Sequence, residues 1–409
     1  MKYVIIGNSA AGIGAVEGIR QLDKQVDITI ITDEAHHTYS RPLISYLLYG
    51  KVNEEQMKYR NDDFYTENNC SLLTNATVTE INDKEKYVGL KDNRHIPYDK
   101  LLVATGSSAF VPPIDGLETV QSIHTFMCLD DARKLNEVLD KNKHVLIIGA
   151  GLIGLKCAEG IFEKVAKISV VDMAPRVLSS ILDEGGSQLV QEHLESKGIN
   201  FKLSNNVKRF NGNTAIMNNG DEISFDILVL AVGVRPNTGL LQEIAEIDKG
   251  IIINEKSETS TENIYAAGDC TQTLDISSGQ RKIMALLPNA YIQGECAGVN
   301  MAGGESVFNK AIPMNAIGFL GLHIITAGNY NGDIYANNEN GKYKRLFFSD
   351  NKLNGYILVG NVEKAGIYTS LIREQIPLDT IDFALVCEKP GLMAFTKEDR
   401  KVKLGGQVK

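Results

Sequence analysis

The chain has 409 residues, of which 43% are hydrophobic and 23% charged, and its net charge is −9. The length predicts two or three domains, because single hydrophobic cores stop growing at about 250–300 residues. The acidic balance argues against nucleic acid as a partner, since phosphate binding needs a basic surface. No apolar run approaches the roughly 20 residues that span a bilayer, and the N-terminus enters a strand without a signal peptide, so we expect a cytoplasmic protein.

The N-terminal segment predicts a strand at 3–6, a glycine-rich turn and a helix. The turn, Gly7-Asn-Ser-Ala-Ala-Gly12, is a G-x-G-x-x-G fingerprint in which serine replaces the middle glycine. Serine is small enough to let the backbone approach a pyrophosphate, and a helix N-terminus offers free N–H groups to phosphates. A second apolar run at 27–32 ends before Asp33 and Glu34, and either acid is placed to bind an adenosine ribose.

The same order of elements returns in the middle of the chain. An apolar run at 145–148 leads into Gly149-Ala-Gly-Leu-Ile-Gly154, a complete fingerprint, and a second run at 168–171 ends before Asp172. A carboxylate there accepts bonds from a ribose 2′-hydroxyl and repels a 2′-phosphate, which favours NADH over NADPH, although Arg176 lies nearby. Two strand–turn–helix–strand units predict two parallel sheets and two nucleotide sites.

Three later segments read as buried strands: one ending at Thr105-Gly106, one running from Leu228 through Gly233 to Asn237, and one ending at Gly268-Asp269. Each alone is an ordinary core strand and turn. An exposed acid after glycine at a strand end can bond a ribityl hydroxyl or a phosphate-bound water. Their order along the chain is the specific signal.

That order resembles the pyridine nucleotide–disulfide oxidoreductase superfamily over essentially the whole chain. The resemblance implies an α/β fold with two Rossmann-like domains, one inserted in the other, plus an α+β C-terminal interface domain. It places an FAD-binding domain at 1–110 and 230–311, an NAD(P)H-binding domain at 111–229 and the C-terminal domain at 312–409. In that last part the sequence predicts strands at 341–348 and 353–360, a turn at 349–351 and a helix at 365–373.

The segment 39–50, Tyr-Ser-Arg-Pro-Leu-Ile-Ser-Tyr-Leu-Leu-Tyr-Gly, resembles the flavin-facing segment of a thiol-free branch. This branch includes NADH:rubredoxin reductases, the N-terminal module of NADH-dependent nitrite reductases, and flavoprotein subunits of anaerobic 2-oxoacid and aldehyde dehydrogenase complexes. Disulfide reductases and water-forming NADH oxidases of the superfamily carry a redox cysteine there, and this segment has none. Ferredoxin reductases of oxygenase systems have a lysine where Tyr46 stands. A thiol relay needs a thiolate beside the flavin, so thiol chemistry is disfavoured.

The six cysteines, at 70, 128, 157, 270, 296 and 387, form no metal-ligand spacing. The adjacent His36 and His37 point in different directions, so no metal site is predicted.

The resemblance also implies the site residues. The FAD ligands are expected in the first turn, the flavin-facing segment and the strand ends: Gly7, Ser9, Ala10, Ala11, Gly12, Asp33, Glu34, Arg41, Pro42, Val78, Thr105, Gly106, Gly268, Asp269, Asn289 and Ala290. The NAD ligands are expected in the second unit: Gly149, Gly151, Leu152, Ile153, Gly154, Asp172 and Gly233. No catalytic side chain is essential beyond the flavin, with Arg41, Pro42 and Glu159 as flavin-side or nicotinamide-side candidates.

These features predict an FAD-dependent oxidoreductase that takes hydride from NADH and passes electrons to a one-electron carrier, such as rubredoxin or an iron–sulfur partner. Two alternatives are an electron-transfer subunit of a larger complex and an NADH oxidase. The C-terminal domain is expected to contribute a partner or homo-oligomer interface.

Overall fold

The computed structural model describes residues 1–338 and 342–403, which form two compact units. The first unit comprises Met1–Ser179, Leu194–Thr273 and Arg281–Asn309. The second comprises Ser180–His193, Leu274–Gln280 and the described part of Lys310–Lys409. The domain boundaries expected from the sequence follow the motifs, whereas these units follow spatial proximity. Those boundaries therefore stay a prediction.

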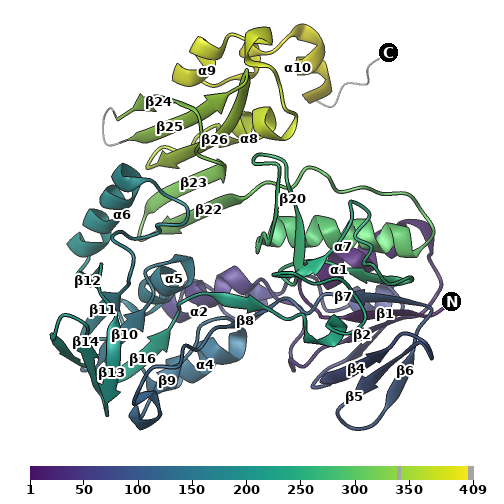
Figure 1. Ribbon diagram of the computed structural model, residues 1–409, viewed down its shortest axis with the longest axis horizontal. Coiled ribbons are helices and arrows are strands. Elements are labelled where there is room, and N and C mark those ends of the chain that lie inside the picture. Colours follow the sequence, from purple (N-terminus) through teal and green to yellow (C-terminus); the bar gives the residue numbers. More distant parts are fainter. Residues whose placement is uncertain (339–341, 404–409) are drawn as a thin grey trace. The chain divides into compact units, whose positions relative to one another are not determined.

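The first unit holds a five-stranded parallel sheet in the order β19-β7-β1-β2-β3. The strands are Ile264–Ala266, Lys100–Val103, Tyr3–Ile6, Ile28–Ile31 and Cys70–Leu73. Numbered within the sheet, this is the 3-2-1-4-5 order of a Rossmann-like domain, with its switch point between β1 and β7. Because β19 follows the whole second sheet in the chain, one nucleotide-binding fold is inserted in the other, as predicted (Figure 1).

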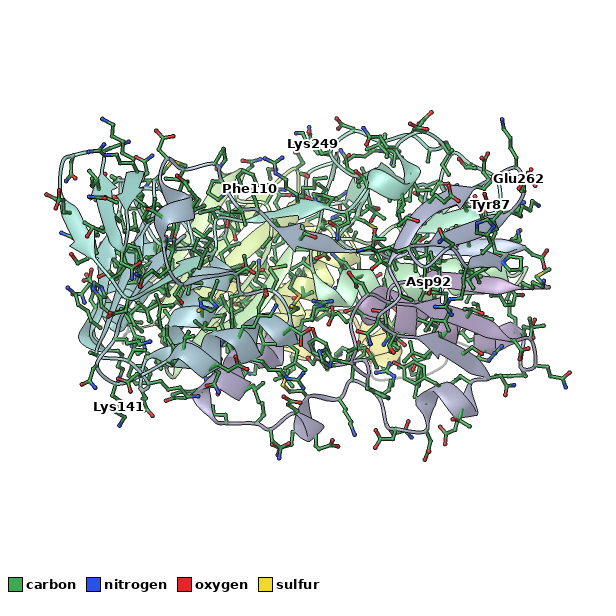
Figure 2. The ribbon with its side chains drawn as sticks, turned by 90° about the horizontal axis from the view of Figure 1, so that it is seen from below. Tyr87, Asp92, Phe110, Lys141, Lys249 and Glu262 are labelled. Atoms are coloured by element: carbon green, nitrogen blue, oxygen red, sulfur yellow. The ribbon has the colours of Figure 1, made fainter. Side chains whose placement is uncertain are left out.

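A second parallel sheet has the order β12-β11-β10-β16-β9. Its strands are Ile199–Lys202, Lys167–Val171, His144–Ile148, Ile227–Leu230 and Ile123–His124. Its switch point lies between β10 and β16. Figure 2 shows Lys141, in the turn before β10, at the opposite end of the first unit from Tyr87 on β5 (Tyr87–Leu90), so the two nucleotide-binding folds lie end to end.

Strand periodicity explains how the first sheet is covered. Tyr3 and Ile5 of β1 face one side, where they pack with helices α1 (Ala10–Leu22) and α7 (Leu287–Met301). Val4 and Ile6 face the other side, against the antiparallel sheet β4-β5-β6 (Val78–Asn82, Tyr87–Leu90, His95–Pro97). Alternate residues of a strand point to opposite faces, so this near-continuous apolar strand buries both.

The remaining elements of the first unit cover or link the two sheets. The helices are α2 (Ile44–Tyr49), α3 (Phe64–Glu67), α4 (Leu129–Val138) and α5 (Leu152–Ile161). The antiparallel sheet β13-β14-β15 (Val207–Asn211, Thr214–Met217, Glu222–Ser224) packs on the second parallel sheet through Phe210 and Met217. Two short strands, β8 (Ser107–Ala109) and β17 (Val234–Pro236), pair antiparallel where the chain passes between the two folds. Strand β18 (Ile251–Ile252) pairs parallel with β20 (Thr271–Asp275), and β21 (Gln280–Lys282) follows.

The second unit is an antiparallel sheet with helices. The strand order is β22-β23-β26-β25-β24, formed by Met314–Phe319, Leu322–Gly328, Lys352–Val359, Tyr343–Ser349 and Asp333–Asn337. The helices are α8 (Ala365–Arg373), α9 (Phe383–Glu388), α10 (Lys397–Lys403) and the first part of α6 (Glu184–Ser196). The predicted strands, turn and helix are therefore confirmed, although Gly341 lies outside the described residues.

One predicted element is wrong. The sequence predicts a single strand from Leu228 to beyond Gly233, but β16 ends at Leu230 and the chain turns before β17 begins. Gly233 has a φ of 110°, a conformation that a continuous strand of L-residues does not adopt. None of the described helices is both long and apolar enough to cross a membrane.

Candidate active site

The two glycine-rich turns have the same local geometry. Gly7 and Gly149 both have a φ of 116°, and a Cβ on either would lie 2.2 Å from a carbonyl oxygen, that of Ala104 or Ala231. The third glycines, Gly12 and Gly154, would each place a Cβ 2.0 Å from the carbonyl oxygen of the first glycine of their own turn. Each turn therefore requires glycine at its first and third positions. This close packing brings the helix N-terminus up to the sheet edge.

The middle position of the second turn is not restricted in this way. A Cβ on Gly151 would meet nothing within 4 Å, so the space above it is open. Ser9 and Gly151 are extended N-cap residues of α1 and α5, and neither makes a side-chain cap hydrogen bond. The first-turn N–H groups of both helices, which begin at Ala10-Ala11 and Leu152-Ile153, are thus left for a ligand. Both turns fit the pyrophosphate of a dinucleotide.

The acids at the two strand ends have different environments. Glu34 forms an ion pair with Arg41 and accepts a hydrogen bond from the Tyr39 hydroxyl at 2.7 Å. Asp33 is exposed at the end of β2. Of the two, Asp33 is the acid whose carboxylate remains open to a ribose.

Asp172, at the end of β11, is fixed by the backbone. Its carboxylate accepts hydrogen bonds from the Ala150 N–H at 2.6 Å and the Ala174 N–H at 2.8 Å. Ala150 lies inside the second glycine turn, and its carbonyl oxygen accepts a bond from the Leu178 N–H at 2.9 Å. The acid is therefore held rigidly beside the turn that it would serve.

Arg41 and Pro42 begin a short 3-10 helix, Arg41–Leu43, directly before α2. Although burial alone would lower the pKa of Arg41, the neighbouring Tyr39 and Glu34 raise it, so the guanidinium stays charged. Arg41 also donates to the Met127 carbonyl at 3.3 Å, and the Leu129 N–H donates to the Tyr39 hydroxyl at 3.0 Å. This network ties the flavin-facing segment to the start of α4.

Most of the other predicted FAD residues meet at one place. A Cβ on Gly268 would lie 3.3 Å from the Ala11 Cβ and 3.4 Å from the Ala290 Cβ, so the ends of β19, α1 and α7 converge there. The next residue, Asp269, accepts a hydrogen bond from the Ser107 hydroxyl at 3.2 Å. Burial raises the pKa of Asp269, while Ser107 and the charge of Arg41 oppose that rise.

Two further groups of predicted FAD residues lie next to this cluster. Thr105 donates to the Asn237 carbonyl at 2.7 Å and its own carbonyl accepts from the Asn237 side chain at 2.9 Å, which fixes the turn that includes Gly106. Asn289 is buried in the first turn of α7.

Three predicted residues lie apart from these clusters. Val78 begins β4 and packs on the hydrophobic core behind the first sheet. Gly233 follows β16, the neighbour of β10, and its carbonyl accepts a bond from the Phe110 N–H at 3.0 Å. Glu159 is buried on α5 and forms an ion pair with Lys156.

The cysteines do not form a redox pair among themselves. All six are free thiols, and burial raises the pKa of each, to about 12 for Cys70 and about 11 for Cys387. Among the described residues, no group of three or more potential ligands is placed to hold a metal ion, and His36 instead bonds Asp130 at 2.8 Å.

Two features of this site were not predicted from the sequence. Helices α1 and α7 lie side by side and touch through glycines, since a Cβ on Gly14 or Gly294 would lie 2.3 Å or 1.9 Å from a carbonyl oxygen of the other helix (Figure 1). The spacing that signals this contact is Gly14-x-x-x-Gly18 in one helix and Gly294-x-x-x-Gly298 in the other. The second feature is Gln293, whose side-chain oxygen accepts a bond from the Gly268 N–H at 2.9 Å.

Comparison with known proteins agrees with this architecture. The family model described as pyridine nucleotide-disulphide oxidoreductase matches residues 1–294, and the rubredoxin NAD+ reductase C-terminal domain matches residues 313–376. The chain belongs to the pyridine nucleotide-disulphide oxidoreductase family. It is 31% identical to the epsilon subunit of NADH-dependent phenylglyoxylate dehydrogenase from Aromatoleum evansii, covering 92% of each chain.

Two further relatives have names that bear on the chemistry. An NADH oxidase from Methanocaldococcus jannaschii is 34% identical over 75% of this chain and 71% of its own length. The crystal structure of NADH:rubredoxin oxidoreductase from Clostridium acetobutylicum has a TM-score of 0.75 at 26% identity, covering 93% of this chain and 97% of that one. The chain is an FAD- and NAD(H)-dependent oxidoreductase.

The environment of Asp269 predicts that a substitution at this position weakens FAD binding. Substituting Asp269→Ala removes a partly buried carboxylate next to Gly268, where β19, α1 and α7 converge, so we expect FAD retention to fall by about tenfold or more, the loss typical of a hydrogen bond to a charged group. The measurement is the ratio of flavin to protein absorbance after dialysis. Asp248→Ala, on another loop of the same unit, is the control. Full FAD retention by Asp269→Ala would contradict the assignment.

Proposed function

We propose that the first fold binds FAD, that the inserted fold binds NADH in preference to NADPH, and that the electrons leave to a one-electron carrier protein. When bound, FAD supplies the chemistry that accepts hydride from nicotinamide and releases electrons singly. The observation that carries the last step is the state of the thiols. Burial raises the pKa of all six, so none is a ready thiolate that could take the electron pair onward.

The residues of the first fold are assigned roles by their positions. The turn Gly7–Gly12 and the N-terminus of α1 would hold the pyrophosphate, and Asp33 would bind the adenosine ribose. The N-terminus of α7, whose N-cap makes no side-chain hydrogen bond, presents its N–H groups near Gly268. Its positive dipole end would stabilise negative charge on a reduced ring.

The preference for NADH rests on Asp172. Its carboxylate is pinned by two backbone N–H groups at the end of β11, so it has little freedom to move away from a 2′-phosphate. Like charges held close together repel strongly outside bulk water. A ribose with a free 2′-hydroxyl would instead find a hydrogen-bond acceptor.

Rubredoxin or an iron–sulfur protein is the proposed carrier. The match of residues 313–376 to a rubredoxin reductase domain and the likeness to NADH:rubredoxin oxidoreductase support this class of partner. A second candidate is an electron-transfer subunit of a larger complex, which the 31% identity to a phenylglyoxylate dehydrogenase subunit favours. In either case we place the protein in the cytoplasm, where thiols stay reduced, with the C-terminal domain as its partner or homo-oligomer interface.

An anaerobic titration tests the first step. Adding NADH to the purified protein should bleach the flavin absorbance at one equivalent, whereas NADPH should do so far more slowly. A protein that binds FAD but is not reduced by NADH would refute the proposal.

A separate prediction concerns electron transfer in variants that lack one of the thiols. Replacing each cysteine singly by serine should leave NADH-to-dye electron transfer within a few-fold of the unmodified rate, because no thiol takes part. Cys128→Ser is the most informative variant, since Cys128 lies beside Arg41 in the flavin-facing network. The melting temperature of each variant separates misfolding from chemistry. A stably folded variant whose flavin is no longer reoxidised would overturn the thiol-free mechanism.

A further inference from the structure

A hydroxyl group joins the first glycine turn to the flavin-facing segment. The Tyr65 hydroxyl, on helix α3, donates a hydrogen bond to the Asn8 side-chain oxygen at 2.8 Å and accepts one from the Thr38 N–H at 3.2 Å. Asn8 is the second residue of the turn Gly7–Gly12, and Thr38 directly precedes the flavin-facing segment 39–50. One side chain therefore bridges two parts of the chain that are assigned separately to FAD.

The Tyr65 ring is held in place by its neighbours. Only 9% of the residue is exposed, its ring meets the His37 ring edge-to-face with the ring centres 5.0 Å apart, and the Phe64 ring lies 5.4 Å away. Burial raises the pKa of Tyr65, although its hydrogen bonds to Thr38 and Asn8 oppose that rise. The hydroxyl therefore keeps its proton at neutral pH and remains the donor to Asn8.

Two polar atoms beside this bridge have no partner among the described residues. Thr38 is only 1% exposed, and both its hydroxyl oxygen and the Nε2 atom of His37 are buried without a hydrogen bond. The Thr38 carbonyl oxygen, by contrast, accepts a bond from the Tyr59 N–H at 3.0 Å. Buried polar groups in native proteins are nearly always hydrogen-bonded, so an unpartnered hydroxyl next to a cofactor turn indicates that a bound group completes its hydrogen bonding.

The place of Thr38 in the chain indicates which part of FAD it meets. The chain runs from Asp33, the acid assigned to the adenosine ribose, to Arg41, assigned to the flavin. Thr38 lies between them, and Tyr65 ties it to the turn assigned to the pyrophosphate. The polar middle of the cofactor, its pyrophosphate and ribityl hydroxyls, offers the hydrogen-bond partners that a threonine hydroxyl requires.

We propose that the Thr38 hydroxyl binds the polar middle of FAD, and that Tyr65 is a positioning residue that sets Thr38 and the glycine turn together. Neither residue belongs to the glycine fingerprint or to the strand ends, and neither was predicted from the sequence. This inference rests on the proposed function, because it requires that the first fold binds FAD.

The variant Thr38→Val separates cofactor binding from a structural role. Valine has nearly the shape of threonine but lacks the hydroxyl group. Because that hydroxyl has no partner among the described residues, its removal should leave the melting temperature of the FAD-free chain unchanged or higher. FAD binding should weaken about tenfold, the loss of a hydrogen bond to a charged group. Titrating FAD into the full-length FAD-free protein, followed by flavin fluorescence, gives the dissociation constant without turnover.

The variant Tyr65→Phe tests the bridge. FAD affinity should fall about tenfold, and the visible absorption bands of the bound flavin should shift, because the start of the flavin-facing segment loses its anchor. In the double variant Tyr65→Phe/Asn8→Ala, FAD affinity should fall no further than in the weaker-binding single variant, since both substitutions break the same hydrogen bond.

Tyr98→Phe is the matched control. Tyr98 is 3% exposed, and its hydroxyl donates to the Asn82 carbonyl at 3.4 Å on the other side of the first sheet. This variant also loses a buried hydroxyl, yet its FAD affinity and flavin spectrum should be unchanged.

Each outcome has one meaning. Unchanged FAD affinity in Thr38→Val would show that the hydroxyl does not bind the cofactor, and an FAD-free Thr38→Val chain that melts several degrees lower would make the hydroxyl structural; either result overturns the inference. If the unmodified protein does not bind FAD, the proposed function fails instead.

Discussion

Substituting Gly151→Val is expected to weaken NADH binding by about 100-fold or more, while the melting temperature stays within a few degrees of the parent. A Cβ at this position meets nothing within 4 Å, and the φ of −82° is one that valine adopts without strain. The branched side chain would therefore enter open space above the helix N-terminus, where the pyrophosphate has to approach. Losing the phosphate contacts of a helix N-terminus should lower the binding affinity roughly 100-fold, because two to three hydrogen bonds to a charged group are removed.

The measurement is a titration of the FAD-loaded variant with NAD+, together with a thermal melt. Gly154→Ala is the contrasting variant, since its Cβ would lie 2.0 Å from the Gly149 carbonyl oxygen and should destabilise the fold. The flavin content of Gly151→Val should be unchanged, because FAD is assigned to the other turn. A folded Gly151→Val protein that binds NAD+ normally would show that this turn is not the pyrophosphate site.

Substituting Asp172→Asn is expected to shift the ratio of kcat/KM for NADPH to that for NADH upward by about 100-fold. Two unit charges 4 Å apart repel by roughly 4 kcal/mol at an effective dielectric constant of about 20, equivalent to about a 1000-fold penalty, and solvent exposure of the ribose reduces it. Asparagine removes the charge at nearly constant shape. Its amide oxygen can keep one of the two bonds from Ala150 and Ala174.

Steady-state kinetics with both nucleotides gives this ratio. The double variant with Arg176→Ala shows whether the nearby guanidinium attracts the 2′-phosphate once the carboxylate charge is gone. Arg176 has a buried Nε without a hydrogen-bond partner among the described residues. An unchanged ratio in Asp172→Asn would mean that nucleotide choice is made elsewhere.

The sequence predicted the parts of the site that depend on local backbone geometry. The turns Gly7–Gly12 and Gly149–Gly154 were expected at strand ends, and the structure places both there with matching φ angles. Glycine spacing carries this information because only glycine avoids the carbonyl oxygens that press on these positions.

Features that depend on side-chain partners could not be predicted in the same way. Asp33 and Glu34 are neighbours in sequence, and only the ion pair of Glu34 with Arg41 separates their roles. The Lys156–Glu159 pair reads as an ordinary helical i, i+3 spacing until Tyr46, more than 100 positions away in the chain, is seen beneath the ammonium. The break between β16 and β17 was missed because the run from Leu228 to Val232 is apolar throughout, although β16 already ends at Leu230 and Gly233 has a positive φ.

The most direct test of the proposed electron path is stopped-flow reoxidation of the NADH-reduced protein. The flavin absorbance is followed after mixing with rubredoxin, a ferredoxin, oxygen or coenzyme A disulfide at matched concentrations. The buried, poorly ionised thiols and the cysteine-free segment at 38–50 predict that an iron protein reoxidises the flavin fastest. Faster reoxidation by oxygen or by the disulfide would contradict electron transfer to a one-electron carrier and indicate an oxidase or a disulfide reductase.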